Sequence, residues 1–258
     1  MRNVFRGRDF LTLMDFTKEE VSYILEVASD LKRMWGTRES HRYLEGRTIA
    51  LLFERHSTRT RISFQAAVTH LGGTAFYMRP DELQLVGRGE PIKDTARVVD
   101  RYCDGLVIRT VDQERMEEFA KYMKNPVINA CTNLNHPCQG LADLLTIKEK
   151  KGQFEGLKLA YSGDPFNDLH SLMIGCSLMG IDIFIAHPEG YNVNEKVLEA
   201  AKENARKSGS KVVLTTDLHE AVNKADIIYA NTWHCMGPAE AEEEKKIGNQ
   251  RTFCQTNY

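Results

Sequence analysis

The sequence predicts an α/β fold of two open parallel sheets, each covered by helices. Short apolar runs alternate with longer amphipathic segments along most of the chain, as strands and helices do in α/β folds. Residues 157–161 and 226–230 are apolar almost throughout, which is typical of parallel strands covered on both faces. Polar clusters follow these runs, at the strand ends where such folds bind ligands. A single eight-stranded barrel has a similar length, and periodicity alone does not distinguish the two architectures.

The first predicted element is a helix that begins at a capping-box pattern, Thr17 with Glu20, and runs to about Trp35. From there strands and helices alternate. We expect strands at residues 47–53, 74–78, 105–109, 126–130, 157–162, 182–187, 211–215 and 226–231. We expect helices at residues 59–71, 92–103, 112–123, 137–151, 168–179, 194–208, 218–224 and 238–246.

A charged segment from Lys148 to Glu155 separates the first four predicted strands from the last four. With 258 residues, the chain is long enough for two domains. We therefore expect one domain at residues 1–150 and a second at residues 151–258.

The amino-acid composition excludes several classes of binding partner. A formal net charge of −2 argues against nucleic acid, so an anion site would be a local basic pocket. No stretch approaches ~18 uninterrupted apolar residues, and we expect no membrane span. The cysteines form no CxxC pair, which predicts reduced thiols in a cytoplasmic protein and neither a zinc site nor a disulfide framework. They are Cys103, Cys131, Cys138, Cys176, Cys235 and Cys254.

The most informative segment is Ser57-Thr58-Arg59-Thr60-Arg61. It lies between a predicted buried strand and a predicted helix. The free N–H groups at a helix start and the positive end of the helix dipole favour an anion there. The planar guanidinium of Arg binds two oxygens at once, which suits a phosphate. The alternative is a solvated helix start, although a plain cap needs only one hydroxyl.

Two other strand ends carry candidate groups. Arg109-Thr110 ends an apolar run, where Arg109 would point into the same crevice or lie exposed at the surface. His136-Pro137-Cys138-Gln139 follows the strand at 126–130 and a polar turn, and Pro137 suits the first position of a helix. Alone, His136 would be interpreted as a surface residue. Beside two anion-binding strand ends it becomes a candidate donor to a reacting carbonyl.

A fourth candidate is the glycine-containing loop from Gln84 to Glu90, in which Arg88 lies between Gly87 and Gly89. Its composition fits either a mobile lid over a phosphate or an ordinary exposed loop.

The segments at 57–61, 109–110 and 136–139 together resemble the carbamoyl-phosphate motifs of the aspartate/ornithine carbamoyltransferases. Four more stretches, 53–55, 87–90, 94–97 and 141–146, are similar to the ornithine type, and the resemblance covers essentially the whole chain. It implies two α/β domains, one for carbamoyl phosphate and one for the amine. It also implies a cytoplasmic homotrimer of arginine biosynthesis, with active sites between subunits and no metal or organic cofactor.

The resemblance also implies the residue roles and the reaction. A neutral amine, ornithine, attacks the carbonyl carbon, and citrulline and phosphate leave. The implied catalytic residues, which polarise the carbamoyl oxygen, are Thr60, Arg109 and His136. The implied carbamoyl-phosphate ligands are Ser57, Thr58, Arg59, Thr60, Arg109, His136, Gln139 and, from a neighbouring subunit, Gln84. The implied amine ligands are Asn167, Asn231, Cys235 and Met236.

This chain departs from the family pattern at several points. Members read Gln-Leu-Gly-Arg-Gly-Glu where residues 84–90 contain one extra residue. The Asp-x-x-x-Ser-Met-Gly segment of the ornithine enzymes is residues 231–237 here, with Asn and Cys in place of Asp and Ser. Of the usual Gly-Asn-Asn stretch, only Asn167 remains in place. Family chains also continue beyond the position of Tyr258, so we expect a truncated C-terminus.

These departures leave three alternatives open. The chain could carbamoylate another amine such as putrescine. It could be a binding or regulatory relative that keeps the carbamoyl-phosphate pocket without turnover. A generic phosphate-binding barrel enzyme is the third alternative, and it leaves the three ordered motifs unexplained.

Overall fold

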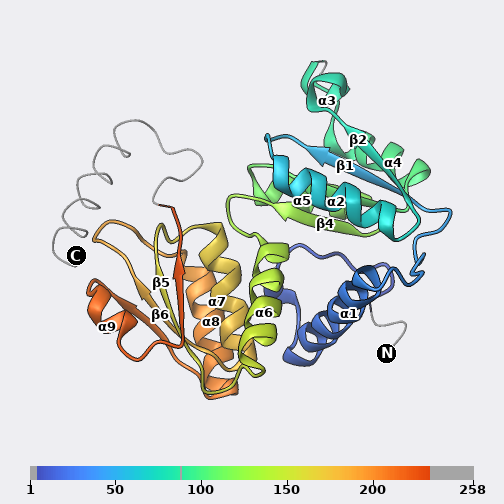
Figure 1. Cartoon of the computed structure of the whole chain (residues 1–258). Coiled ribbons are helices and arrows are strands. Elements are labelled where there is room, and N and C mark those ends of the chain that lie inside the picture. The colour runs from blue at the N-terminus through green and yellow to red at the C-terminus, as the bar shows by residue number, and fades with distance from the viewer. Residues whose placement is uncertain (1–4, 88, 233–258) are drawn as a thin grey trace. The chain divides into compact units, whose positions relative to one another are not determined.

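The computed structural model describes residues 5–87 and 89–232, which divide into two compact units (Figure 1). The first unit comprises the chain up to Asp15 and Tyr23–Cys138, and the second comprises Phe16–Ser22 and the chain from Gln139 onward. Each contains one four-stranded parallel sheet. The predicted pair of open sheets is therefore confirmed, and the single barrel is wrong.

The sheet of the first unit has the strand order β2-β1-β3-β4. Its strands are β1 (Thr48–Phe53), β2 (Thr74–Met78), β3 (Gly105–Arg109) and β4 (Val127–Cys131). From β1 the chain moves to one side for β2 and then to the other side for β3. The order thus reverses between β1 and β3, and a reversal of this kind opens a ligand crevice at the carboxyl ends. Phe53 pairs with Arg109, and Arg109 with Cys131, so these three strands end level with one another.

Helices cover both faces of this sheet. The helices of the first unit are α1 (Lys18–Gly36), whose residues up to Ser22 belong to the second unit, α2 (Thr58–His70), α3 (Gln84–Gly87), α4 (Ile92–Tyr102) and α5 (Gln113–Tyr122). Successive residues of β1 point to opposite faces. Ala50 and Leu52 join the core under α4 and α5, whereas Leu51 and Phe53 join a cluster that includes Phe64 of α2.

Two predictions about local structure have clear outcomes. The capping box is confirmed: the Thr17 N–H donates to Glu20 Oε2 at 3.0 Å, and the Glu20 N–H donates to Thr17 Oγ1 at 3.3 Å. The first part of the segment predicted as a loop is helical: Gln84–Gly87 form the single turn α3, which follows a 3₁₀ turn at Pro80–Glu82. A further 3₁₀ turn lies at Leu13–Asp15.

The sheet of the second unit has the strand order β7-β6-β5-β8, again parallel. Its strands are β5 (Lys158–Ser162), β6 (Asp182–Ala186), β7 (Val212–Thr215) and β8 (Ile227–Ala230). The order reverses between β5 and β8, so this unit also has a switch point, formed by the first and last of its strands among residues 139–232. The helix predicted at 238–246 lies outside the described residues.

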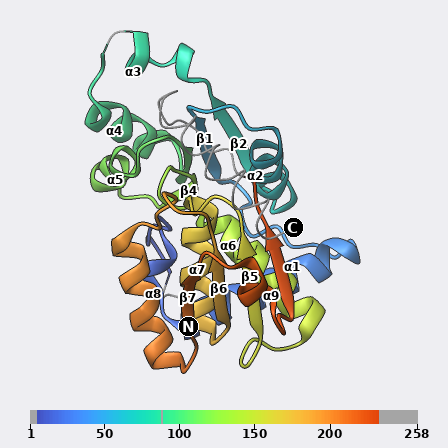
Figure 2. The ribbon, with the colours of Figure 1, turned by 90° about the vertical axis from the view of Figure 1, so that its left-hand side faces the viewer.

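The helices of the second unit follow its strands in the order that the sequence predicts. They are α6 (Pro137–Lys151), which begins in the first unit, α7 (Asn167–Met179), α8 (Glu195–Ser208) and α9 (Leu218–Val222). Figures 1 and 2 show α7 and α8 side by side, while α9 packs on β5 and β6. Nearly every residue of α7 is buried, which makes it the central helix of this unit.

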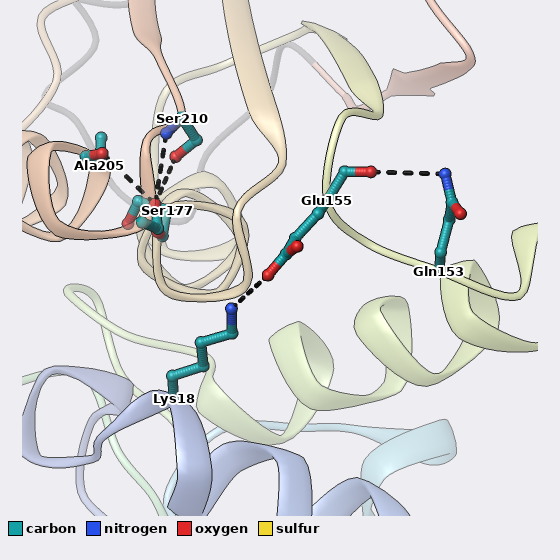
Figure 3. A network of polar contacts seen from close by, with 7 residues as sticks. Lys18, Gln153, Glu155, Ser177, Ala205 and Ser210 are labelled. Carbon is teal, nitrogen blue, oxygen red and sulfur yellow. Dashed lines mark hydrogen bonds and ion pairs between the residues drawn. The ribbon is translucent and has the colours of Figure 1, made fainter.

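Polar contacts tie loops to these helices (Figure 3). Lys18 Nζ in the first turn of α1 donates to Glu155 Oε1 at 2.6 Å, and the Glu155 carbonyl accepts from the Gln153 amide at 3.4 Å. The Lys18 and Glu155 side chains are largely exposed, so their ion pair adds little stability. The Ser208 hydroxyl donates to the Ser177 carbonyl at 2.7 Å and so joins the end of α8 to α7. Within residues 5–87 and 89–232, no helix has the length and apolar character that a membrane crossing requires.

Candidate functional site

The first group of candidate residues lies at the start of α2. Ser57 is the N-cap, with extended backbone, and its hydroxyl oxygen accepts from the Thr60 N–H at 3.3 Å. Thr58 and Arg59 are exposed in the first turn of the helix. Because the helix dipole and free N–H groups point out of this end, the segment offers hydroxyls and one guanidinium beside a positive helix terminus.

Arg61 takes a different place from its neighbours. Its guanidinium lies 3.8 Å from the ring centroid of Tyr77 on β2, which is a cation–π contact. The sequence grouped Arg61 with the anion-binding residues, whereas its planar group is stacked on an aromatic ring at the adjacent strand.

The structure brings Arg109 and Thr60 together at the switch point of the first unit. Arg109 Nη1 donates to Thr60 Oγ1 at 3.3 Å, which joins the end of β3 to the start of α2. Arg109 Nε is buried and has no hydrogen-bond partner within the described part of the chain. A buried N–H of a permanent cation is costly to leave unpaired, so this donor is suited to an anionic ligand.

His136 lies at the end of the next strand. The turn that leads to it is closed by the Thr132 N–H donating to the Asn135 carbonyl at 2.9 Å and by the Asn135 N–H donating to Thr132 Oγ1 at 3.1 Å. Pro137 begins α6, as predicted. His136 is half-buried, and the level ends of β3 and β4 put it on the same edge of the sheet as Arg109.

The second group of candidate residues lies at the switch point of the second unit. Asn167 is buried at the start of α7, and Asn231 follows β8. The Asn231 amide donates to Tyr161 Oη at 3.1 Å and to Asp168 Oδ2 at 3.4 Å. Asn231 is therefore held by β5 and by the first turn of α7, the two elements that flank the β5–α7 loop.

Close packing of the β5–α7 loop depends on Gly163. Its φ is +149°, and a Cβ there would lie 2.8 Å from both Cβ and the carbonyl oxygen of Asn231. Only glycine allows the loop to approach Asn231 this closely.

Gln139 contacts a carboxylate that the sequence did not single out. Gln139 Nε2 donates to Asp143 Oδ1 at 2.9 Å, and Tyr229 Oη donates to Asp143 Oδ2 at 3.4 Å. Burial, followed by the negative charge of Asp168, raises the pKa of Asp143 to about 6. The i, i+4 spacing of Gln139 and Asp143 on one helix was a usable signal, whereas the approach of Tyr229 from β8 was not visible in the sequence.

Of the remaining candidate residues, only Gln84 lies within the described part of the chain. Gln84 begins α3 with its side chain exposed. Cys235 and Met236 lie outside the described residues. Among residues 5–87 and 89–232, no three His, Cys, Asp or Glu side chains gather as a metal site would require. Within residues 5–87 and 89–232 the cysteines are not joined to one another by disulfides; they are Cys103, Cys131, Cys138 and Cys176.

Comparison with protein families gives two matches that cover most of the chain. Residues 8–149 match the model of the carbamoyl-P binding domain of aspartate/ornithine carbamoyltransferase. Residues 155–257 match the model of the Asp/Orn binding domain of the same family.

Individual proteins show the same similarity. The ornithine carbamoyltransferase of Pyrococcus abyssi is 49% identical over 243 residues, which cover 94% of this chain and 76% of that protein. The enzyme of that name from Bacillus subtilis is 49% identical over 241 residues, covering 93% and 74%. The structure of ornithine carbamoyltransferase from Pyrococcus furiosus is similar with a TM-score of 0.89 at 46% identity, covering 94% of this chain and 77% of that one. Aspartate transcarbamoylase from Trypanosoma cruzi, in complex with carbamoyl phosphate and aspartate, gives a TM-score of 0.84 at 27% identity, covering 98% and 79%.

Proposed function

This chain belongs to the aspartate/ornithine carbamoyltransferase family, and we propose that it transfers the carbamoyl group of carbamoyl phosphate to the amine of ornithine, giving citrulline and phosphate. The observation that carries the proposal is the contact of Arg109 Nη1 with Thr60 Oγ1, which unites two of the sequence motifs at one switch point. The ornithine-type relatives at nearly half identity support ornithine over other amines.

In this proposal the start of α2 and the end of β3 hold the phosphate. The ligands are Ser57, Thr58, Arg59, Thr60 and Arg109. The helix terminus supplies N–H donors, and the two guanidinium groups supply charge that remains at any physiological pH. The buried Nε of Arg109 supports this role, because it is a donor already removed from water.

Thr60, Arg109 and His136 act on the carbamoyl oxygen. The neutral amine forms a bond to the carbonyl carbon, and negative charge grows on the oxygen. The bond from that carbon to the phosphate oxygen then breaks, and the proton lost by the amine passes to the departing phosphate or to solvent. Each donor fixed at the oxygen contributes about 3 kcal/mol to the stabilisation of this charge. Holding both reactants in place supplies much of the remaining rate enhancement.

The second unit binds the amine and the carbamoyl nitrogen. We assign the amine to Asn167, Asn231, Cys235 and Met236. Gln139 receives the carbamoyl NH₂ group. Its amide nitrogen already donates to Asp143, which leaves its amide oxygen to accept a hydrogen bond from that group.

Domain limits, assembly and location are also part of the proposal. Residues 1–150 form the carbamoyl-phosphate domain and residues 151–258 the amine domain, which the family matches at 8–149 and 155–257 support. The exposed side chain of Gln84 supports its use in the active site of a neighbouring subunit of a homotrimer. Free thiols support a cytoplasmic location.

A carbamoyl-transfer assay with ornithine, putrescine, lysine and aspartate tests the reaction. We expect a ureido product from ornithine at a rate well above that from the other amines. Binding of carbamoyl phosphate in calorimetry without product from any amine would contradict the proposal. For the assembly, mixing inactive Gln84→Ala and Arg109→Met chains should restore activity, since a shared site would draw these residues from different subunits.

A further inference from the structure

We propose that Gln113 and Arg115, in the first turn of α5, are positioning residues that hold the strand ends carrying Arg109 and His136. This inference deepens the proposed function and rests on it. Neither residue belongs to a motif identified in the sequence. Both side chains contact residues at the edge of the sheet where Arg109 and His136 lie.

Arg115 fixes the ends of β1 and β3 through one carboxylate. Its Nε donates to Glu54 Oε1 at 3.0 Å and Oε2 at 2.9 Å, and its Nη2 donates to Oε1 at 2.7 Å. Glu54 Oε2 also accepts from Thr110 Oγ1 at 2.6 Å, and the Glu54 N–H donates to the Arg109 carbonyl at 2.8 Å. Arg109 is therefore held at its own carbonyl and at the next residue, both by Glu54.

This ion pair is partly buried, with exposed side-chain fractions of 29% for Arg115 and 15% for Glu54. Such a pair contributes little net stability, because desolvation offsets much of the attraction. Its bidentate geometry instead fixes direction, and the hydrogen bonds and charge of Glu54 hold the pKa of Arg115 above its ordinary value. The pair thus restricts the position of the strand ends more than it stabilises the fold.

Gln113 fixes the turn that leads to His136. It is only 4% exposed, and its Oε1 accepts from Thr132 Oγ1 at 2.7 Å and from Asn135 Nδ2 at 3.4 Å. Thr132 and Asn135 are themselves at most 1% exposed and close the turn after β4 through the hydrogen bonds described above. Loss of the Gln113 oxygen would remove one acceptor from each of two buried donors, and the turn would relax.

The attachment of α5 to the sheet does not depend on these polar residues. Met116 and Phe119 are fully buried in the core cluster under the sheet and anchor the helix. The helix should remain docked when Gln113 or Arg115 is changed. A change at either residue should therefore displace Arg109 or His136 without unfolding the unit.

The experiment compares Gln113→Met, Arg115→Lys, Thr132→Val and Thr132→Ser in the full chain, with Glu114→Gln as the control on the exposed face of the same turn. We expect Gln113→Met and Thr132→Val to lower kcat about 10- to 100-fold, the loss that a displacement of about 1 Å produces, with the KM for ornithine within about threefold of wild type. Thr132→Ser keeps the hydroxyl and should restore most of kcat. Arg115→Lys should weaken binding of inorganic phosphate in calorimetry about tenfold, because Arg109 moves.

Several outcomes would overturn the inference. One is a kcat for Gln113→Met and Thr132→Val equal to that of Glu114→Gln. Another is that the losses of kcat parallel the losses of melting temperature across the variants, with no recovery of kcat in Thr132→Ser. If the wild-type chain carbamoylates no amine, the proposed function fails on its own. The phosphate-binding comparison of Arg115→Lys with Glu114→Gln then decides the inference, and equal affinities would refute it.

Discussion

Replacement of Asp143 by Asn should stabilise the second unit at neutral pH and leave it unchanged in acid. The carboxyl of Asp143 has a pKa of about 6 in the folded chain against an ordinary value of 3.8, because burial and the charge of Asp168 oppose its ionisation. At pH values between 3.8 and about 6, Asp143 therefore keeps its proton in the folded state and has lost it in the unfolded state. Stability consequently falls as pH rises from about 4 to 6 and stays at the lower level above that range.

The size of the effect follows from the shift. Roughly two pKa units correspond to about 3 kcal/mol, at 1.36 kcal/mol per unit. Asp143 is only half-buried, so solvent screening reduces the expected gain to about 1–2 kcal/mol. Asn keeps an oxygen that can accept from Gln139, so the neutral variant loses the charge and not that hydrogen bond.

Urea unfolding of wild type and Asp143→Asn from pH 4 to pH 8, with hydrogen exchange of the α7 amides to assign the transition, measures the difference. We expect no difference at pH 4, a growing advantage of the variant up to about pH 6, and a constant advantage above it. Glu199→Gln, at an exposed carboxylate of α8, is the control and should give a flat profile. An advantage that is constant from pH 4 to 8, or a loss of stability at pH 7, would refute the reasoning.

Three further predictions concern the candidate site. Arg109→Met should weaken inorganic phosphate binding about 10- to 100-fold in calorimetry, because a charge-assisted donor is lost; unchanged affinity would remove Arg109 from the phosphate site. His136→Ala should lower kcat about 100-fold with KM for carbamoyl phosphate nearly unchanged, the pattern of a donor that acts on the developing oxyanion. Gly163→Ala should raise the KM for ornithine and cost about 1–3 kcal/mol in urea unfolding, since its Cβ would meet Asn231 at 2.8 Å; a neutral result in both assays would contradict the close packing of the loop.

The strands were predictable because parallel strands leave a strong local signal. The run from Ile49 to Phe53 is apolar throughout, because both faces of β1 contribute to the core, and the end of the strand at Phe53 was predicted correctly. Helix starts were equally local, since the hydroxyl of Ser57 and the ring of Pro137 mark the first turn of α2 and α6. The contact of Arg109 with Thr60 followed from these ends and from the rule that parallel strands present their carboxyl ends at one edge.

Strand order and long-range polar contacts were not predictable in the same way. No local pattern states that β5 lies beside β8 or that β1 lies beside β3, so the sequence could not identify which strand ends form each switch point. Gln113 looked like an ordinary helical residue. The role that we propose for it depends on Thr132, nineteen positions away, and on a near-complete burial that only the folded chain creates. The short helix α3 was missed because a single turn leaves no periodicity to detect.

The two switch points differ in charge, and the difference matches the reactants that we assign to them. At the first, Arg59 and Arg109 lie beside a positive helix end, which favours an anionic phosphate, and the carboxylate of Glu54 is paired with Arg115. At the second, Asn231 is neutral but donates to the carboxylate of Asp168, whose charge also raises the pKa of Asp143. The carboxylate of Asp168 lies close enough to Asp143 to raise the pKa of that carboxyl, and this negative charge favours a cationic amino acid. Both sheets are parallel and have a switch point, although their strand orders differ. In our proposal the side chains at the strand ends therefore set the charge of the ligand that each unit binds.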